Sequence, residues 1–170
     1  KSKRSQLCHR DNKRNMTRKL RTAVIGVGNM GQHHARIYSE IATLVSIADT
    51  NISLAKTTAA KYKTNWYSNY EDMLIKEKID ALSIVVSTPL HKQIAVYCLQ
   101  KHIPVLIEKP IANTVISAEE IVNTAERNRT YCMVGHIERF NPAVIKLKQL
   151  ISSYAFGDII SLLAIRVGIN

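Results

Sequence analysis

Short, uninterrupted apolar runs alternate with amphipathic segments along most of the chain. The runs are rich in β-branched residues and are continuous, which is typical of parallel strands covered on both faces. This alternation of strand and helix predicts an α/β fold built on a doubly wound parallel sheet. Strands are expected at residues 21–25, 44–48, 65–67, 81–86, 105–107 and 131–134, and helices from about residue 29 and at 52–62, 70–75, 90–101 and 117–128.

The last of these helices carries a recognisable start. Ser117 is followed three residues later by Glu120. This is the spacing of a capping box, in which the serine is the N-cap and the glutamate bonds back to it. We therefore expect the helix to begin at Ser117.

The regular alternation of strands and helices ends after residue 138. A helix is predicted after Asn141 and Pro142, followed by a turn around Gly157 and a long strand at residues 159–167. Nothing later in the chain offers that strand a partner, and an unpaired apolar strand leaves an exposed edge. We expect one complete domain over residues 18–137 and, over residues 138–170, the start of an incomplete second α/β domain.

The positive charge is concentrated at the N-terminus. The 170 residues include 24 Lys or Arg and 13 Asp or Glu, a formal net charge of +11. Residues 1–21 hold nine of the basic residues and one of the acidic ones, so the other 149 residues carry only +3. Nucleic acid is therefore not an expected partner of the body of the chain, and any such contact is expected through residues 1–17.

Residues 1–17 are polar, lack apolar periodicity and are expected to be a disordered basic leader. Three interpretations stay open: sequence upstream of a natural start at Met16, an arm that binds RNA or an acidic surface, or an organelle transit peptide. No apolar segment follows the charges, which argues against a secretory signal. No stretch approaches the length of a membrane span, so no membrane partner is expected.

The cysteines indicate the compartment. Cys8, Cys98 and Cys132 are isolated and lack the spacing of metal ligands, so no metal site is predicted. They are interpreted as intracellular thiols of a cytoplasmic protein. Cys98 falls in a predicted helix and Cys132 in a predicted strand, and both are expected to pack in the core.

Three glycines spaced G-x-G-x-x-G join the first strand to the first helix. Gly26 allows the tight turn, Gly28 lets the backbone approach a pyrophosphate, and Gly31 lets the helix pack closely on its strand. The helix that begins near Asn29 and Met30 would direct its free N–H groups and its positive dipole end at the phosphates. The pattern predicts a dinucleotide site, to which these five residues are assigned.

A carboxylate at the expected distance supports this site. Asp49 lies 18 residues after Gly31, where the second strand ends, and can accept hydrogen bonds from both hydroxyls of an adenosine ribose. It would repel a 2′-phosphate, and Thr50 and Asn51 provide no arginine to receive one. NAD is therefore expected in preference to NADP. The alternative is a glycine-rich turn followed by an ordinary loop aspartate.

Five segments of the chain together resemble the Gfo/Idh/MocA family of sugar and inositol oxidoreductases, over about residues 19–168. The resemblance implies a nicotinamide-binding Rossmann domain at residues 18–137 and a C-terminal substrate and oligomerisation domain from residue 138. It implies hydride transfer between NAD and a secondary hydroxyl of a sugar, nucleotide sugar or cyclitol, by a protein that forms a homo-oligomer when complete. The segments are VIGVGNMGQHHARIY, YSNYEDML, STPLHKQIA, VLIEKPIANT and VGHIERFNPAV.

The most telling piece is Glu108-Lys109-Pro110 at the end of a strand. The resemblance implies that Lys109 is the catalytic lysine beside the nicotinamide and the substrate hydroxyl. A cation there favours alkoxide character at the carbon that loses hydride. Glu108 is assigned to the cofactor site, where it either contacts the nicotinamide ribose or holds Lys109. The alternative for Lys109 is a solvated lysine after a strand.

Other site residues follow from the same resemblance. Ser87, Thr88 and Pro89 end the fourth strand, where this architecture places the cofactor crevice. His91 matches the family's histidine in the same turn and is assigned with them; the alternative is a helix N-terminal residue without a ligand. His33 and His34, in the first helix, are assigned no chemistry.

Two residues at the expected domain boundary are also assigned. His136 is expected to face the nicotinamide as a catalytic residue and Arg139 to face the substrate. The alternative for each is a purely structural role.

The segment VGHIERFNPAV followed by GDIISLLAIRVG resembles the nucleotide-sugar 3-dehydrogenase branch of the family, which acts on UDP-linked N-acetylhexosamines, more than the inositol branch. The family's proton-transferring histidine lies beyond this segment. We therefore expect the 170 residues to bind cofactor with little or no activity. A second hypothesis stays open: a non-catalytic NAD-binding or redox-sensing protein whose basic leader contacts nucleic acid.

Overall fold

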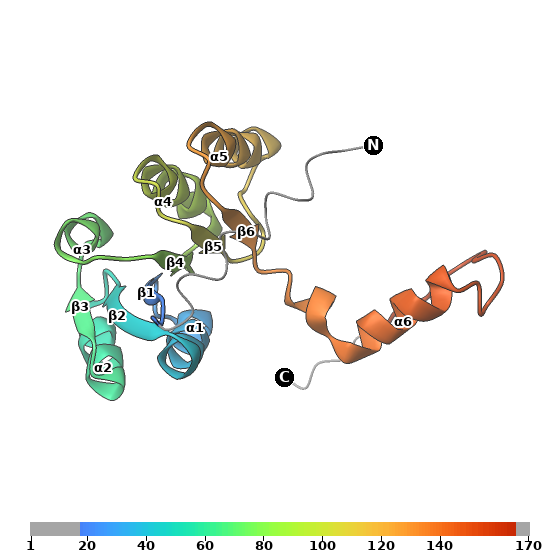
Figure 1. Cartoon of the computed structure of the whole chain (residues 1–170), viewed down its shortest axis with the longest axis horizontal. Helices are drawn as coiled ribbons and strands as arrows, with labels where there is room; N and C mark the ends of the chain where they lie inside the picture. The colour runs from blue at the N-terminus through green and yellow to red at the C-terminus, as the bar shows by residue number, and fades with distance from the viewer. Residues whose placement is uncertain (1–17, 166–170) are drawn as a thin grey trace. The chain divides into compact units, whose positions relative to one another are not determined.

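The computed structural model describes residues 18–165, so the expectations for residues 1–17 lie outside it (Figure 1). The chain divides into two units, Lys1–Gly135 and His136–Asn170, which are described separately. None of the described helices is long and apolar enough to cross a membrane.

The first unit is built on a six-stranded, fully parallel sheet with the order β3-β2-β1-β4-β5-β6. The predicted doubly wound α/β fold is confirmed. Its strands are β1 (Arg21–Ile25), β2 (Thr43–Ala48), β3 (Asn65–Tyr67), β4 (Ala81–Ile84), β5 (Val105–Ile107) and β6 (Cys132–Val134). Its helices are α1 (Asn29–Ile41), α2 (Ile52–Tyr62), α3 (Tyr70–Lys76), α4 (Thr88–Gln100) and α5 (Val115–Arg127).

Alternate residues of β1 contribute to two separate cores. Ala23 and Ile25 pack in the core shared with α3, α4 and α5, whereas Val24 packs in the core shared with α1 and α2. Figure 1 shows these two groups of helices on opposite faces of the sheet. Successive side chains of a strand point to opposite faces, so a strand covered on both faces must be apolar at every position. This explains the continuous apolar runs of the sequence.

The strand order creates a switch point between β1 and β4. The connections from β1 lead through β2 to β3 on one side, while β4 leads through β5 to β6 on the other. The loops at the carboxyl ends of β1 and β4 therefore diverge and leave a crevice, the place where ligands bind in open α/β sheets.

The predicted start of α5 is wrong. The N-cap is Thr114, whose extended backbone precedes the helix and whose hydroxyl accepts a hydrogen bond from the Ser117 N–H at 3.1 Å. Ser117 is thus already inside the first turn. Glu120 forms an ion pair with Lys92 of α4 at 3.1 Å. Thr114 and Ser117 each carry a hydroxyl that can cap a helix, and the spacing from Ser117 to Glu120 selected the wrong residue.

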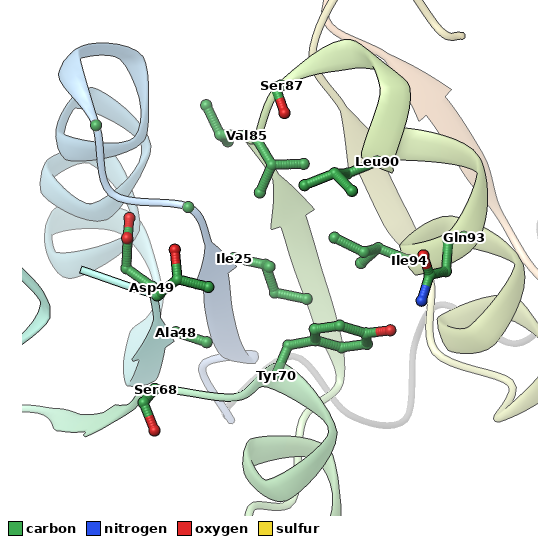
Figure 2. Close-up of a pocket in the computed structure, with 14 residues that line it drawn as sticks. Ile25, Ala48, Asp49, Ser68, Tyr70, Val85, Ser87, Leu90, Gln93 and Ile94 are labelled. Atoms are coloured by element: carbon green, nitrogen blue, oxygen red, sulfur yellow. The ribbon is translucent and has the colours of Figure 1, made fainter. Parts of the chain in front are cut away.

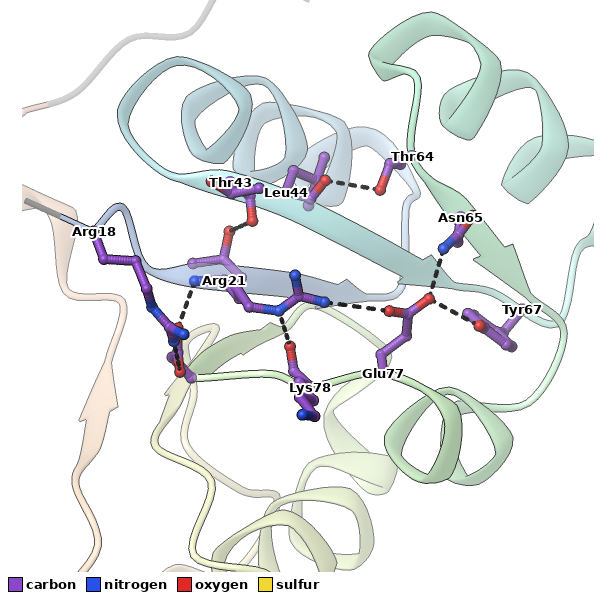
Figure 3. Close-up of polar contacts among 11 residues, drawn as sticks. Arg18, Arg21, Thr43, Leu44, Thr64, Asn65, Tyr67, Glu77 and Lys78 are labelled. Atoms are coloured by element: carbon purple, nitrogen blue, oxygen red, sulfur yellow. Dashed lines mark hydrogen bonds and ion pairs between the residues drawn. The ribbon is translucent and has the colours of Figure 1, made fainter.

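Polar side chains connect the amino-terminal ends of the strands (Figure 3). Asp80, just before β4, accepts a hydrogen bond from the Arg21 N–H at 2.7 Å and pairs with Arg18 at 2.8 Å. The Arg21 guanidinium donates to the Lys78 carbonyl at 2.6 Å and lies 3.7 Å from Glu77. The Arg21 N–H bond, helped by Arg18 and opposed by partial burial, lowers the pKa of Asp80.

The second unit contains a short 3₁₀ helix, η2 (Ile137–Phe140), and α6 (Pro142–Ser152). Asn141 caps α6 by accepting a hydrogen bond from the Ala143 N–H at 3.0 Å. The strand predicted at residues 159–167 is not formed over residues 159–165, and residues 166 and 167 lie outside the described part. No described segment pairs with residues 159–165, and a strand without a neighbour has no ladder of hydrogen bonds to hold it.

Candidate cofactor site

The loop between β1 and α1 depends on two glycines for its own packing. Gly26 has a φ of +86°, in the left-handed region, and a Cβ on it would overlap the carbonyl oxygen of Val85. A Cβ on Gly31 would overlap the carbonyl oxygen of Gly26. Both positions therefore require glycine whether or not a ligand is bound.

Gly28 is different, because a Cβ on it would meet nothing within 4 Å. Gly28 is also the N-cap of α1, and no side chain caps the helix there. The first N–H groups of α1, starting at Asn29 and Met30, thus have no side-chain cap and lie at the positive end of the helix dipole. A Cβ at Gly28 would extend into the volume that an anion needs at this helix end.

Asp49, at the end of β2, connects that strand to the same loop. Its Oδ2 accepts a hydrogen bond from the Val27 N–H at 2.8 Å, and its Oδ1 accepts one from the Asn51 N–H at 2.8 Å. A carboxylate offers about four acceptor positions, so each oxygen retains capacity for a further donor. The side chain is half-buried and lines the neighbouring pocket.

A pocket of about 400 Å³ lies at the carboxyl ends of β1, β2 and β4. In Figure 2, Asp49 lies beside the loop that follows β1, while Leu90 and Ile94 approach from α4. The pocket brings together four of the residues assigned from sequence: Gly26, Gly28, Asp49 and Ser87. The complete lining is Ile25, Gly26, Gly28, Ala48, Asp49, Thr50, Ser68, Tyr70, Val85, Val86, Ser87, Leu90, Gln93 and Ile94.

Sequence reasoning missed most of the walls of this pocket. Ser68 and Tyr70 come from the loop after β3 and the start of α3, whereas Leu90, Gln93 and Ile94 come from α4. Two signals could have found them. The residues after every parallel strand share one edge of the sheet, and positions i, i+3 and i+4 share one face of a helix.

The other residues assigned around the β4–α4 turn lie next to the pocket. Ser87 is the N-cap of α4, without a side-chain cap bond, and Thr88 and Pro89 form its first turn. The described pocket lining includes Ser87 but not Thr88 or Pro89.

Glu108 and Lys109 follow β5 directly. Lys109 is exposed, whereas Glu108 is only 8% exposed. Glu108 Oε2 accepts a hydrogen bond from the backbone N–H of Lys109 at 3.1 Å. The Lys109–Pro110 peptide bond is cis. The buried carboxylate thus contacts the backbone of the residue that carries the exposed ammonium.

His34 of α1, to which the sequence analysis assigned no chemistry, contacts this carboxylate. Its Nε2 lies 3.0 Å from Glu108 Oε1 and its Nδ1 lies 2.9 Å from Ser83 Oγ. The signal was present in the helical period, because Gly31 and Ala35 are the buried positions of α1 and His34 lies on the same stripe.

His91 of α4 is 1% exposed. Its Nδ1 lies 3.0 Å from the carbonyl oxygen of Pro110, and its Nε2 lies 3.1 Å from that of Val86. Both ring nitrogens face backbone carbonyls, and His91 is not part of the pocket lining. The structure thus places His91 against the loop after β5.

His136 and Arg139 belong to the second unit, where His136 precedes η2 and Arg139 lies within it.

The residues of the first unit fit a dinucleotide. The space at Gly28, the uncapped N-terminus of α1 and the remaining acceptor capacity of Asp49 match a diphosphate joined to a ribose. Apolar side chains of Ile25, Val85 and Leu90 supply walls for a flat ring.

A family model and several curated relatives match the chain. Residues 20–136 match the Gfo/Idh/MocA model, described as an oxidoreductase family with an NAD-binding Rossmann fold. The chain is 33% identical over 130 residues to UDP-N-acetylglucosamine 3-dehydrogenase of Acidithiobacillus ferrooxidans. The matched stretch covers 76% of this chain and 41% of that protein. The chain thus spans about two fifths of the length of this curated relative.

Solved structures show the same similarity. Myo-inositol 2-dehydrogenase from Lactobacillus plantarum superposes with a TM-score of 0.80 at 26% identity, covering 84% of this chain and 44% of that one. The WlbA dehydrogenase from Bordetella pertussis, solved with NADH and UDP-GlcNAcA, superposes with a TM-score of 0.77 at 26% identity, covering 82% and 44%.

Proposed function

Because the chain belongs to the Gfo/Idh/MocA oxidoreductase family, we propose that the protein binds NAD and transfers a hydride between it and a secondary hydroxyl of a sugar, nucleotide sugar or cyclitol. The observation that carries this proposal is the open space at Gly28 in front of the uncapped N-terminus of α1, with the Asp49 carboxylate beside it. NAD, when bound, supplies the carbon that accepts or donates the hydride.

Two groups hold the cofactor in this proposal. The N–H groups at the start of α1 bind the diphosphate, because they have no partner within the helix and lie at its positive end. Asp49 accepts hydrogen bonds from the adenosine ribose with the lone pairs that Val27 and Asn51 leave free.

The same carboxylate favours NAD over NADP. A 2′-phosphate would replace a hydrogen-bond donor with a dianion beside Asp49. The nearest candidate cation on α2, Lys56, has its Nζ 4.9 Å from the centre of the Trp66 ring. It is therefore engaged in a cation–π contact.

Lys109 provides the chemistry at the substrate in this proposal. Its ammonium is exposed at the carboxyl end of β5, on the edge of the sheet where the cofactor crevice opens. There it would hold the substrate oxygen and stabilise negative charge on it as hydride leaves the adjoining carbon. His136 would face the nicotinamide and Arg139 the substrate. The 170 residues by themselves are expected to bind NAD with little or no turnover.

The relatives support a nucleotide sugar as the substrate. The Acidithiobacillus relative is a UDP-N-acetylglucosamine 3-dehydrogenase, and the Bordetella structure contains UDP-GlcNAcA together with NADH. We propose a UDP-linked N-acetylhexosamine, with a free cyclitol as the second choice because of the inositol dehydrogenase relative.

Isothermal titration calorimetry of the 170-residue chain with NAD and with NADP tests the cofactor proposal. NAD is expected to bind at least about tenfold more tightly than NADP, which corresponds to a difference of about 1.4 kcal/mol in binding free energy. Tighter binding of NADP would contradict the role of Asp49, and binding of neither nucleotide would contradict the function itself. Titration of UDP-N-acetylglucosamine and of myo-inositol into the chain with NADH present measures the Kd of each compound. The compound that binds more tightly indicates the substrate class.

A further inference from the structure

The segment Glu108–Pro110 is held from both sides by histidines of different helices. His34 of α1 contacts the side chain of Glu108, and His91 of α4 contacts the carbonyl of Pro110. Lys109 lies between these two contacts and is itself exposed. The histidines therefore hold the residue before and the residue after the proposed catalytic lysine.

The first anchor is a chain of buried and half-buried polar groups on the side of the sheet that faces α1. Glu108 Oε1 faces His34 Nε2, His34 Nδ1 faces Ser83 Oγ at 2.9 Å, and Ser83 Oγ lies 2.7 Å from the Tyr38 hydroxyl. Ser83 donates its hydroxyl proton to the Tyr38 oxygen, and His34 lies between Ser83 and the Glu108 carboxylate. The chain links α1, β4 and the end of β5.

The buried carboxylate needs this chain. Glu108 is removed from water, and an ionised carboxylate without partners in such a place is costly. Its two oxygens are bound by different groups, Oε1 by His34 and Oε2 by the backbone N–H of Lys109. Orientation of the carboxylate by His34 thus fixes where the Lys109 backbone is held.

The second anchor acts on the other side of Lys109. His91 is almost fully buried, and its ring lies between the carbonyls of Val86 and Pro110. Val86 lines the candidate cofactor pocket. The imidazole therefore joins a wall of this pocket to the residue that follows Lys109.

We propose that His34 and His91 are positioning residues that hold Glu108 and Pro110 and thereby direct Lys109 at the cofactor. This inference rests on the proposed function. A lysine side chain has four flexible methylene groups, so its ammonium is placed only if its backbone is placed. A displacement of about 1 Å at a reacting group can cost about 100-fold in rate.

The test compares the protection of Lys109 by NAD in matched variants. An amine-specific acetylating reagent is applied with and without NAD, and acetylation of Lys109 relative to Lys101 is measured by peptide mass spectrometry. At about ten times its Kd, NAD is expected to slow the labelling of Lys109 about tenfold in the wild type. The exposed His33 supplies a control, and His33→Leu is expected to behave as the wild type.

His34→Leu and His91→Leu are expected to reduce this protection to about twofold or less, because a mobile Lys109 stays accessible. The NAD Kd, measured separately, is expected to change less than about threefold, since the diphosphate and ribose contacts remain. His34→Gln and His91→Asn keep a donor and are expected to recover part of the protection. Recovery would not follow if the histidines only filled space.

The outcomes separate the two proposals. If NAD binds the wild type but does not protect Lys109, the proposed catalytic placement fails. If NAD protects Lys109 equally in the wild type and in both leucine variants, the positioning role is overturned and the proposed function stands. Should a leucine variant prove unfolded by circular dichroism, the isosteric Glu108→Gln decides. The glutamine has one accepting oxygen where Glu108 has two, so it cannot accept hydrogen bonds from both His34 and the Lys109 N–H. Unchanged protection of Lys109 in Glu108→Gln would overturn the inference.

Discussion

Asp49 Oδ2 accepts a hydrogen bond from the backbone N–H of Val27 at 2.8 Å, which joins the carboxyl end of β2 to the loop after β1. The carboxylate therefore orders the protein's own glycine loop as well as facing the pocket. A residue with both roles should affect ligand affinity more than its ribose contacts alone would.

Asp49→Asn tests this double role. An asparagine side chain has one accepting oxygen, so it cannot replace both the Asp49 oxygen that accepts from Val27 and the one that accepts from Asn51, and the charge that strengthens the ribose bonds is lost. We expect the Kd for NAD to rise about 10- to 100-fold, the range for hydrogen bonds to a charged group. Calorimetry measures it, with Asp72→Asn on the exposed start of α3 as the charge-matched control. Equal affinities of Asp49→Asn and wild type would refute the assignment.

Two glycines of the loop are expected to have different effects when replaced: Gly31 on stability and Gly28 on NAD binding. Gly31→Ala places a Cβ against the Gly26 carbonyl and is expected to lower the free energy of unfolding by about 1–3 kcal/mol or more. Gly28→Ala meets no protein atom and should leave stability unchanged while weakening NAD binding. Urea unfolding and calorimetry of the two variants check this. The proposal would not survive normal NAD affinity in a folded Gly28→Ala.

Asp80 should make stability depend on acid pH. Its folded-state pKa is lowered from the ordinary value of 3.8, so its contribution is complete above that value and is lost as the pH falls through the lowered pKa. Asp80→Asn should cost about 1 kcal/mol at neutral pH, because the Arg21 bond is partly exposed. The difference from wild type should shrink below about pH 3.8. Urea unfolding at several pH values measures it, with the exposed Glu119→Gln as control; a constant difference would contradict the prediction.

Cys98 should be an inert thiol in the folded protein. Burial raises its pKa to about 12, slightly opposed by Lys101, and its side chain is inaccessible. At pH 8 only about one molecule in ten thousand would carry the reactive thiolate. Iodoacetamide followed by peptide mass spectrometry should find Cys98 unmodified in buffer and modified in urea, with added glutathione as the freely reacting reference. Alkylation in buffer at the rate of glutathione would show that the helix opens.

Most elements of the first unit could be predicted because their determinants are local. A strand buried on both faces is marked by unbroken apolar residues, and 65–67 and 105–107 agree with β3 and β5 residue for residue. Errors arose where two local patterns competed or where a distant partner was needed. Thr114 and Ser117 both offered a cap for α5, and residues 159–165 have apolar character but no neighbouring strand among the described residues.

The amino-acid sequence alone determined the order of the elements, the glycine loop and the distance from Gly31 to Asp49, since these depend on spacing within one or two adjoining elements. The tertiary structure decided which side chains meet across the sheet. His34 and Glu108 are 74 positions apart, and His91 and Pro110 are 19 apart. Such pairs form because parallel crossovers bring α1, α4 and the end of β5 to one edge of the sheet, a geometry that no local spacing encodes.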